Sequence, residues 1–179
     1  MLEGGLAGLT VDRDLRWFFA IELAKRGAIT RAELDAILAS DPSVTGELSH
    51  TEAIATLPDA AIKAETWNAL TTGELSNSKR LYLARGFMQP RQVELLKEYV
   101  DPYFDALLDL WNSTSYEEAS TKVQMLYPRF IVSQETLDKS DAWLNGAGKD
   151  APVVLRRLVS EGRDSLARTL RIQSRDSAN

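Results

Sequence analysis

The stretch RGFMQPRQVELLKEYVDPYF, residues 85–104, decides the fold of this chain. It places a corner at Gly86 and then two helices that each begin at a proline. Asp101 is predicted to cap the second helix, with Pro102 at its first position, where the missing N–H of proline costs nothing. Gln89-Pro90 is a weaker version of the same signal. The pattern is typical of short helices joined by tight corners.

The first helix of the chain is expected around an apolar face at helical spacing. Leu15, Phe18 and Phe19 form this face, and Trp17 widens it, so the helix should be buried over much of its circumference. Gly27 is predicted to end the helix, because a residue without Cβ readily adopts the left-handed conformation that closes a helix.

Capping residues mark the starts of later helices. A reciprocal capping box is expected at Thr30 and Glu33, where each side chain bonds the backbone N–H of the other residue. Further starts are predicted at Asp41-Pro42, at Ser115 with Glu118, and at Ser133. A long last helix carries an apolar stripe formed by Leu155, Leu158, Val159, Gly162, Leu166 and Leu170.

These signals predict about ten helices, and no segment alternates as a strand should; residues 130–132 are expected to form a loop. Short connections make successive helices antiparallel neighbours, and such pairs stack on one another. We therefore predict an all-α fold, an alpha-alpha superhelix of irregular antiparallel helix pairs like those of HEAT and armadillo proteins. Residues 1–10 are expected to be a disordered or linker start, and residues 11–179 a single helical domain.

The chain lacks the residue types that most catalytic chemistry needs. Cysteine is absent and His50 is the only histidine, so a zinc site with two histidines cannot form. We interpret His50, close to Glu52, as part of a solvated surface pair. The sequence contains neither a phosphate-binding glycine loop nor a nucleophile elbow. We therefore predict no catalytic residue, no metal ligand and no cofactor in this chain.

Composition also bears on the compartment and on membranes. No run approaches the roughly 18 consecutive apolar residues of a membrane span, and residues 1–10 do not have the pattern of a signal peptide. The lack of cysteine fits a reducing compartment. We expect a cytoplasmic protein without a membrane partner.

Charge is distributed unevenly along the chain. After Asp150 there are six arginines and three acids, a net +3, whereas the rest has 15 basic and 23 acidic residues, a net −8. An acidic body binds phosphate backbones poorly, which argues against a nucleic-acid partner and against a DNA-repair glycosylase built on helical repeats. The basic last helix is either a solvated face or a surface that docks on an acidic partner.

Aromatic residues concentrate between residues 87 and 111. They form either a core across the Asp101-Pro102 corner or the wall of a groove, since the amphipathic ring of tyrosine suits a half-wet surface. Arg80 and Arg85 flank this region. Each either binds a carboxylate through its guanidinium fork or caps the end of its own helix.

Seven segments follow one another in an order that covers nearly the whole chain. They are DRDLRW (12–17), AIKAETW (61–67), the stretch 85–104, LYP (126–128), VSQET (132–136), DAWL (141–144) and LRRLVSEGRD (155–164). Together they resemble the C-terminal domain of the aminopeptidase N family of zinc metallopeptidases, in its bacterial branch. The same domain is shared with the ER aminopeptidases. The segments are packing and capping patterns rather than chemical motifs.

The resemblance implies a helical domain that lies beside a thermolysin-like catalytic domain and encloses its peptide cavity. The implied partners are the catalytic domain of the same polypeptide and a peptide substrate, and zinc is implied as a cofactor of the parent enzyme's catalytic domain only. The candidates for the cavity wall are Arg80, Arg85, Phe87, Gln89, Tyr103 and Arg156. The alternative is a free-standing helical-repeat adaptor that binds a peptide or protein on its concave face.

Overall fold

The computed structural model describes residues 11–176, so the linker predicted at residues 1–10 lies outside the described part. Between residues 11 and 176 the chain forms ten α-helices, one 3-10 helix and no strand, which confirms the all-α prediction. In chain order the elements are α1 (Arg13–Ala24), α2 (Arg31–Ser40), α3 (Val44–Thr56), α4 (Ala60–Thr72), α5 (Asn77–Phe87), α6 (Val93–Leu96), η1 (Lys97–Tyr99), α7 (Val100–Asn112), α8 (Tyr116–Leu126), α9 (Gln134–Asn145) and α10 (Val153–Asp176).

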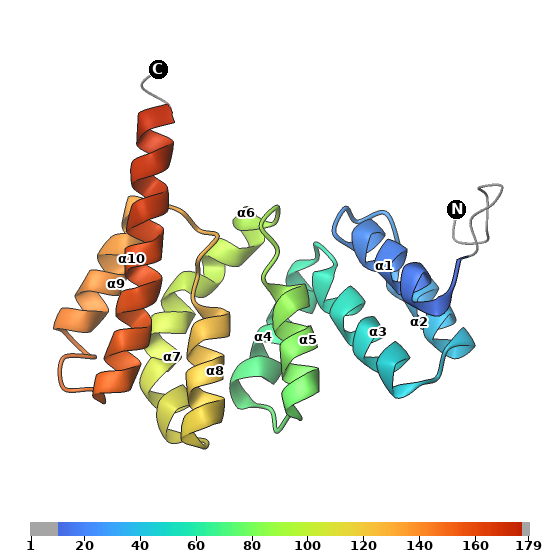
Figure 1. Ribbon diagram of the computed structural model, residues 1–179, viewed down its shortest axis with the longest axis horizontal. Coiled ribbons are helices and arrows are strands. Elements are labelled where there is room, and N and C mark those ends of the chain that lie inside the picture. Colours follow the sequence, from blue (N-terminus) through green and yellow to red (C-terminus); the bar gives the residue numbers. More distant parts are fainter. Residues whose placement is uncertain (1–10, 177–179) are drawn as a thin grey trace. The chain divides into compact units, whose positions relative to one another are not determined.

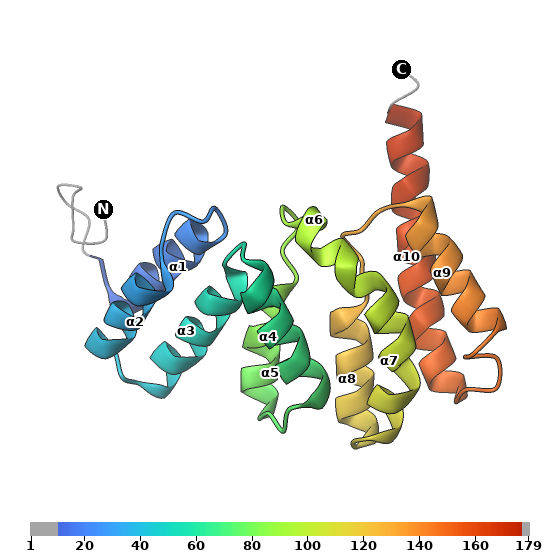
Figure 2. The ribbon, with the colours of Figure 1, turned by 180° about the vertical axis from the view of Figure 1, so that it is seen from behind.

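The chain divides into two compact units, Met1–Leu95 and Leu96–Asn179. In the first unit α3 packs against α1, α2, α4 and α5. In the second, α7 packs against α8 and α9, and α10 packs against the same two helices. Consecutive helices run in opposite directions in the pairs α4/α5, α7/α8 and α9/α10 (Figures 1 and 2). The predicted antiparallel pairing is therefore confirmed, while the likeness to HEAT repeats stays a prediction.

The end of α1 and the start of α2 form as their sequence predicts. Gly27 has a φ of 64°, and the N–H of Ala28 donates to the carbonyl of Leu23 at 2.9 Å, which closes the helix with a left-handed residue. Glu33 Oε2 accepts from the N–H of Thr30 at 2.8 Å, and Thr30 Oγ1 accepts from the N–H of Glu33 at 3.3 Å. The capping box is complete, and two helix ends are fixed by local signals alone.

The buried face of α1 differs from the predicted one. Trp17, Ala20 and Ala24 are buried, whereas Phe18 is 57% exposed. The indole N–H of Trp17 donates to Asp41 Oδ2 at 3.0 Å, so the inward direction of the helix follows the tryptophan. Phe18 lies one position further around the helix and points to solvent instead of into the core.

The prediction that Asp41 caps a helix beginning at Pro42 is wrong. α3 begins at Val44, and Ser43 is its cap, because the hydroxyl of Ser43 accepts from the N–H of Gly46 at 3.0 Å. The Asp41 carboxylate is buried and accepts from the Trp17 indole and, at 2.8 Å, from the Ser43 hydroxyl. A tertiary contact has taken the side chain that would otherwise have capped the helix.

The two helix starts predicted in the stretch 85–104 also move. α6 begins at Val93 and not at Pro90. α7 begins at Val100, before Asp101, and has no side-chain cap because η1 runs directly into it. The carboxylate of Asp101 instead forms an ion pair with Lys139 on α9.

The apolar stripe of α10 forms the centre of the second unit. Leu155, Leu158, Val159 and Leu166 are buried, as their spacing predicts, and Leu170 is half-buried. Gly162 lies within this stripe because a Cβ at this position would come 2.7 Å from the ring of Tyr127. That ring is buried, and its hydroxyl bonds Ser140 Oγ at 2.9 Å, so it has no room to retreat.

No helix between residues 11 and 176 is long and apolar enough to cross a membrane.

Replacing Gly162 by leucine tests this close approach. We expect Gly162→Leu to lower the free energy of unfolding by about 2 kcal/mol, since overpacking exceeds the gain in helix propensity. Urea unfolding followed by circular dichroism measures the loss. Ser165→Leu, at an exposed position of the same helix, is the matched control and should change stability by less than about 0.5 kcal/mol. Equal effects of the two substitutions would contradict the assigned contact.

Candidate functional site

The six residues predicted for a cavity wall belong to both units. Arg80, Arg85 and Phe87 lie on α5, and Gln89 follows in the corner before α6. Tyr103 lies on α7 and Arg156 on α10, in the second unit. Their surroundings differ widely, and only some of them reach a surface.

Four of the six side chains are buried: Arg80, Phe87, Tyr103 and, at the corner after α5, Gln89. Phe87 is 1% exposed and packs its ring against Trp67 at 5.9 Å. Arg80 is 2% exposed, and its guanidinium donates to the carbonyl of Leu75 at 2.9 Å. Tyr103 is fully buried, its hydroxyl donates to a backbone carbonyl of α8 at 2.9 Å, and burial raises the pKa of its phenol well above the ordinary value. Arg80, Phe87 and Tyr103 belong to the packed interior of their units and not to an open surface.

Arg156 closes the end of a neighbouring helix. Its guanidinium donates to the carbonyl of Leu144 at 2.7 Å and to the carbonyl of Gly148. Both acceptors lie at the end of α9 or just after it, where carbonyl groups have no partner within the helix. The positive charge is favourable there because it faces the negative end of the helix dipole.

Arg85 and Gln89 lie at the corner that follows α5. The side-chain amide of Gln89 donates to the carbonyl of Arg85 at 2.7 Å. Gln89 therefore caps the end of α5, which was one of the two roles considered for the Arg85 side chain. The Arg85 side chain is exposed, and its guanidinium carbon lies 5.5 Å from the ring of Tyr82. Arg85 therefore presents its charge at the surface of the corner.

The corner depends on a residue that sequence analysis missed, Lys63 of α4. Its side chain is fully buried, and its ammonium donates to the carbonyls of Ala55 at 2.7 Å, Gly86 at 3.2 Å and Phe87 at 3.2 Å. These carbonyls belong to the ends of α3 and α5. Nearby, Gln92 donates to the carbonyl of Thr56 at 2.8 Å. Two side chains thus satisfy the last carbonyls of two helices.

A sequence signal for Lys63 did exist. The buried positions of α4 are Lys63, Thr66 and Leu70, which recur at the three- and four-residue spacing of one helix face. A lysine on such a face predicts a buried cation with several acceptors, because an unpaired buried charge is strongly unfavourable. Burial lowers the pKa of Lys63 to about 7.

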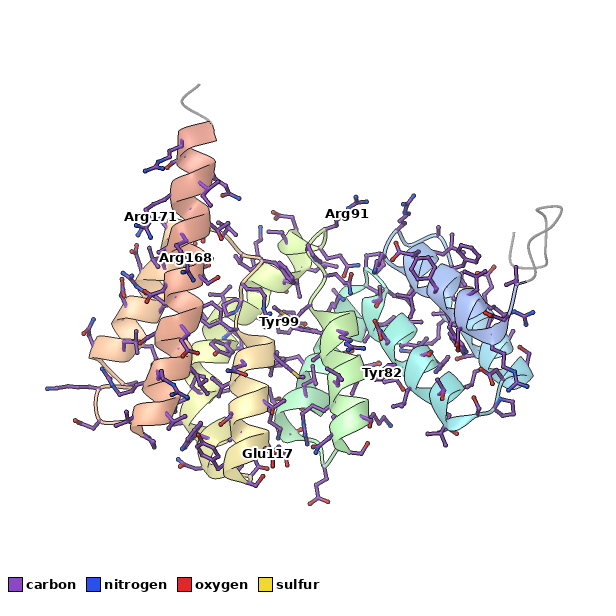
Figure 3. All side chains as sticks on the ribbon, in the orientation of Figure 1. Tyr82, Arg91, Tyr99, Glu117, Arg168 and Arg171 are labelled. Carbon is purple, nitrogen blue, oxygen red and sulfur yellow. The ribbon has the colours of Figure 1, made fainter. Side chains whose placement is uncertain are left out.

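An open depression of about 270 Å³ lies where the end of α1 meets this corner. Six residues line it: Glu22, Lys25, Arg26, Gln89, Pro90 and Arg91. Lys25 forms an ion pair with Glu22 at 2.6 Å, and Arg26 and Arg91 are exposed, Arg91 at the tip of the corner (Figure 3). Three cations against one carboxylate leave a local excess of positive charge in an otherwise acidic unit.

The charge of Lys25 also affects the pKa of Glu52, which is half-buried on α3. Burial raises the pKa of its carboxyl, and the nearby charges of Arg85 and Lys25 oppose that shift. Arg85 therefore belongs to the same electrostatic neighbourhood as Lys25. The depression suits a ligand with a carboxylate or another small anionic group.

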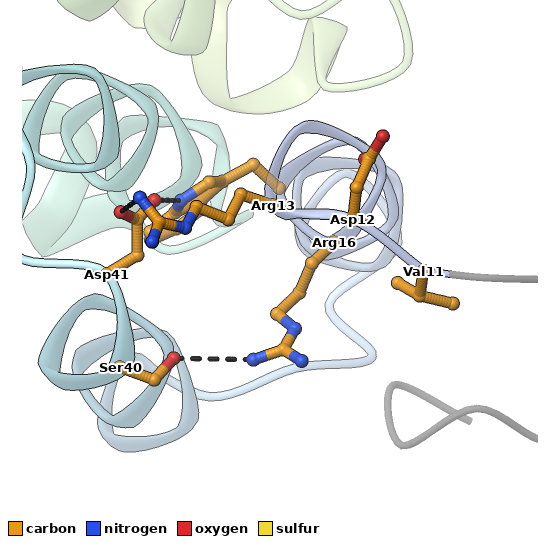
Figure 4. A pocket seen from close by; sticks show the side chains of 7 residues that line it. Val11, Asp12, Arg13, Arg16, Ser40 and Asp41 are labelled. Carbon is orange, nitrogen blue, oxygen red and sulfur yellow. Dashed lines mark hydrogen bonds and ion pairs between the residues drawn. The ribbon is translucent and has the colours of Figure 1, made fainter.

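A second depression, of about 310 Å³, lies between the start of α1 and the end of α2 (Figure 4). Asp41 contributes its carboxylate here, whose pKa is lowered by its hydrogen bonds from Ser43 and from the Trp17 indole. Arg16 Nη1 donates to the hydroxyl of Ser40 at 3.4 Å. Two acids and two arginines line this depression, so it lacks the excess of positive charge that makes the first one suited to an anion.

His50 pairs with a different acid from the one expected beside it in sequence. Its Nε2 lies 2.7 Å from Asp35 Oδ1 on α2, and its ring meets Trp17 edge-on. Among the residues that the structure describes, no three or more His, Cys, Asp or Glu side chains come together to hold a metal ion. His50 and Asp35 alone do not provide the ligands that a zinc site needs.

The sequence of the chain is similar to those of known proteins. Residues 1–168 match the family described as ERAP1-like C-terminal domain. The chain is also 42% identical over 174 residues to a protein of Streptomyces lividans named Aminopeptidase N. That alignment covers 97% of this chain and 20% of the relative, so the chain spans about a fifth of the relative's length.

Replacing Lys63 by methionine tests its role at the corner. The apolar chain fits the same space but removes the donor from three buried carbonyls, of which, among the described residues, only that of Phe87 has another donor, the N–H of Gln89 at 3.0 Å. We therefore expect the free energy of unfolding to fall by about 2–4 kcal/mol. Chemical unfolding measures the loss. Lys79→Met, at an exposed position of α5, is the control and should cost less than about 0.5 kcal/mol. If Lys63→Met leaves the free energy of unfolding unchanged, the carbonyls do not need the nitrogen of Lys63 as a donor.

The lowered pKa of Lys63 predicts a pH dependence of stability. Its pKa is about 7 in the folded protein and near 10.5 in the unfolded chain. Between these values the unfolded chain binds a proton that the folded protein has released, so stability rises with pH, by at most about 1.4 kcal/mol per unit. The contribution is fully present above about pH 10.5 and is lost as the pH falls towards 7.

The difference in unfolding free energy between the wild type and Lys63→Met isolates this proton from all others. We expect the difference to increase by more than about 1 kcal/mol from pH 7 to pH 9. A difference that stays constant over this range would contradict a lowered pKa for Lys63.

Proposed function

The chain belongs to the family of ERAP1-like C-terminal domains, and from this premise we propose that it is the C-terminal helical domain of an aminopeptidase N. Such an enzyme removes N-terminal amino acids from peptides. The observation that carries the proposal is the 42% identity over 97% of the chain to a relative with that name. The chain spans 20% of this relative, which supports the proposal that a catalytic domain and its zinc belong to another part of the same polypeptide.

The proposed role is to dock on the catalytic domain and enclose the peptide cavity. A closed cavity excludes water and orients the peptide, so a domain changes affinity and length preference without supplying a catalytic group. Packed helix pairs suit this role because they form a firm wall. The domain then acts through shape and electrostatics, and bond cleavage takes place elsewhere in the enzyme.

The part of the wall proposed to contact the substrate is the corner after α5. Lys25, Arg26 and Arg91 line an open depression together with Gln89. Arg85 does not line it, but its charge acts on Glu52, as that of Lys25 does. The C-terminal carboxylate of a peptide carries the complementary charge and fits the guanidinium fork. A peptide bound there at its far end has its N-terminus directed away, towards the catalytic site.

Lys63 and Gln92 give this corner its rigidity in the proposed mechanism. They bond the ends of α3 and α5 from the inside, which fixes the backbone from which Arg85 and Arg91 project. A binding group on a fixed backbone loses less conformational entropy when it binds its ligand. In this proposal Arg80 and Phe87 contribute as packing within the first unit, Tyr103 as packing within the second, and Arg156 as the cap of α9.

The remaining expectations about partners belong to the same proposal. The acidic first 150 residues disfavour nucleic acid, which leaves peptides and the catalytic domain as partners. The absence of cysteine is compatible with the cytoplasm, which we propose as the compartment.

The carboxylate contact can be tested in the full-length enzyme by comparing a ten-residue peptide with its C-terminally amidated form. The wild type should prefer the free acid, and Arg26→Gln with Arg91→Gln should reduce the ratio of the two kcat/KM values. Partly exposed charge contacts of about 1 kcal/mol predict a reduction of roughly fivefold.

Arg157→Gln is the control for this experiment, because Arg157 is an exposed arginine of the second unit. It should leave the ratio of free acid to amide unchanged. If the double substitution also leaves the ratio unchanged while stability is preserved, the depression does not bind the peptide carboxylate. If the full-length protein releases no N-terminal residue from any peptide, the proposed enzyme is wrong.

A further inference from the structure

The last helix is much longer than the helices that support it. α10 has 24 residues, whereas α9 has 12 and α8 has 11. At 1.5 Å per residue these lengths correspond to about 36 Å against about 18 Å. The C-terminal half of α10 accordingly extends past the ends of α8 and α9 in both views (Figures 1 and 2). We call residues 167–175 the overhang.

Side chains of the overhang are largely exposed. Leu166, just before it, is 2% exposed, but Ile172 is 60% exposed. Arg168, Arg171 and Arg175 are exposed as well, the first two visible along the upper part of α10 (Figure 3). The sequence ARTLRIQSR of the overhang contains three arginines and no acid.

Arginines elsewhere on α10 have partners within the chain. Arg163 makes a two-pronged contact with Asp141, at 2.8 and 3.0 Å, and Arg157 lies 3.6 Å from Glu161. Among the side chains of residues 11–175, no carboxylate forms an ion pair with the three arginines of the overhang, although Arg171 Nε donates to the carbonyl of Ala167 at 3.2 Å. The charge pattern of the helix therefore changes where its packing ends.

We propose that the overhang docks on an acidic surface of the catalytic part of the same polypeptide. The inference rests on the proposed function and names the surface through which the domain docks. Three exposed arginines without a carboxylate partner among residues 11–175, around one exposed isoleucine, match a partner with carboxylates around a small apolar patch.

The size of the overhang decides between the available partners. Nine residues offer far less than the roughly 800 Å² per partner of a stable complex between separate proteins. A second copy of the chain would therefore bind too weakly through this surface. A partner in the same polypeptide is present at a high effective concentration, so a small charged contact is sufficient. The relative is about five times as long as this chain and leaves ample sequence for such a partner.

Hydrogen exchange in the full-length enzyme tests the docking. The backbone amides of residues 170–175 should exchange at least about tenfold more slowly in the wild type than in a variant with Arg168→Glu, Arg171→Glu and Arg175→Glu. In the wild type, 0.5 M salt should remove most of this protection, because the contact is electrostatic. Small-angle scattering should show a larger radius of gyration for the variant.

Two single substitutions on the same helix provide the matched comparison. Arg171→Glu should reduce the protection, whereas Arg157→Glu, at an exposed position before the overhang, should not. Protection that survives the triple reversal would overturn the proposal. Rapid exchange of residues 170–175 in the wild type at low salt would overturn it as well.

A membrane is the competing partner for a basic helix, and vesicles separate the two. The full-length protein should not sediment with vesicles containing 30% phosphatidylserine; arginine-dependent sedimentation with unchanged compactness would replace docking by membrane binding. The outcome is independent of the peptide experiment. If the triple reversal has no effect while Arg26→Gln with Arg91→Gln still alters the preference for the free acid, the proposed function stands and this docking surface is wrong.

Discussion

The ammonium of Lys63 is the contact on which the first unit depends. It reaches from α4 to the carbonyls that end α3 and α5, so three helices meet at one nitrogen. A helix end placed in the interior needs donors for its last carbonyls, and water is not available there. The corner after α5 can be both buried and tight because the side-chain nitrogen of Lys63 supplies those donors. The exposed residues of the corner project from the backbone that these buried hydrogen bonds hold in place.

Local signals in the sequence predicted the helices well, and tertiary contacts account for the errors. Thr30, Ser115 and Ser133 cap their helices as expected, since a cap needs only a side chain and the N–H groups that follow it. Asp41 does not, because its carboxylate bonds Trp17, 24 residues earlier in the chain. A competing partner at that distance cannot be read from the residues beside a helix start.

The candidate site was only partly predictable for the same reason. Arg85 and Gln89 were expected at a corner, and they do lie at one. Their separate roles, Gln89 as helix cap and Arg85 as exposed charge, follow from the hydrogen bond of the Gln89 amide to the Arg85 carbonyl. Lys25 and Arg26 come from the end of α1, about 60 residues before Arg91 in sequence, and only the packing of α1 and α5 on α3 brings them to one depression. Spacing along a chain carries no information about such a meeting.

The contact between Gly162 and Tyr127 constrains how related sequences differ. The ring occupies the space that any side chain at position 162 would need, and the ring itself is fixed by its bond to Ser140. A larger residue at position 162 fits this packing only if position 127 carries a smaller one, and Ser140 then keeps only its bond to the carbonyl of Thr136. The three positions are therefore coupled in packing, although they lie on or beside three different helices. A change at one of them alone opens a cavity, produces a clash or removes the bond between the two buried hydroxyls.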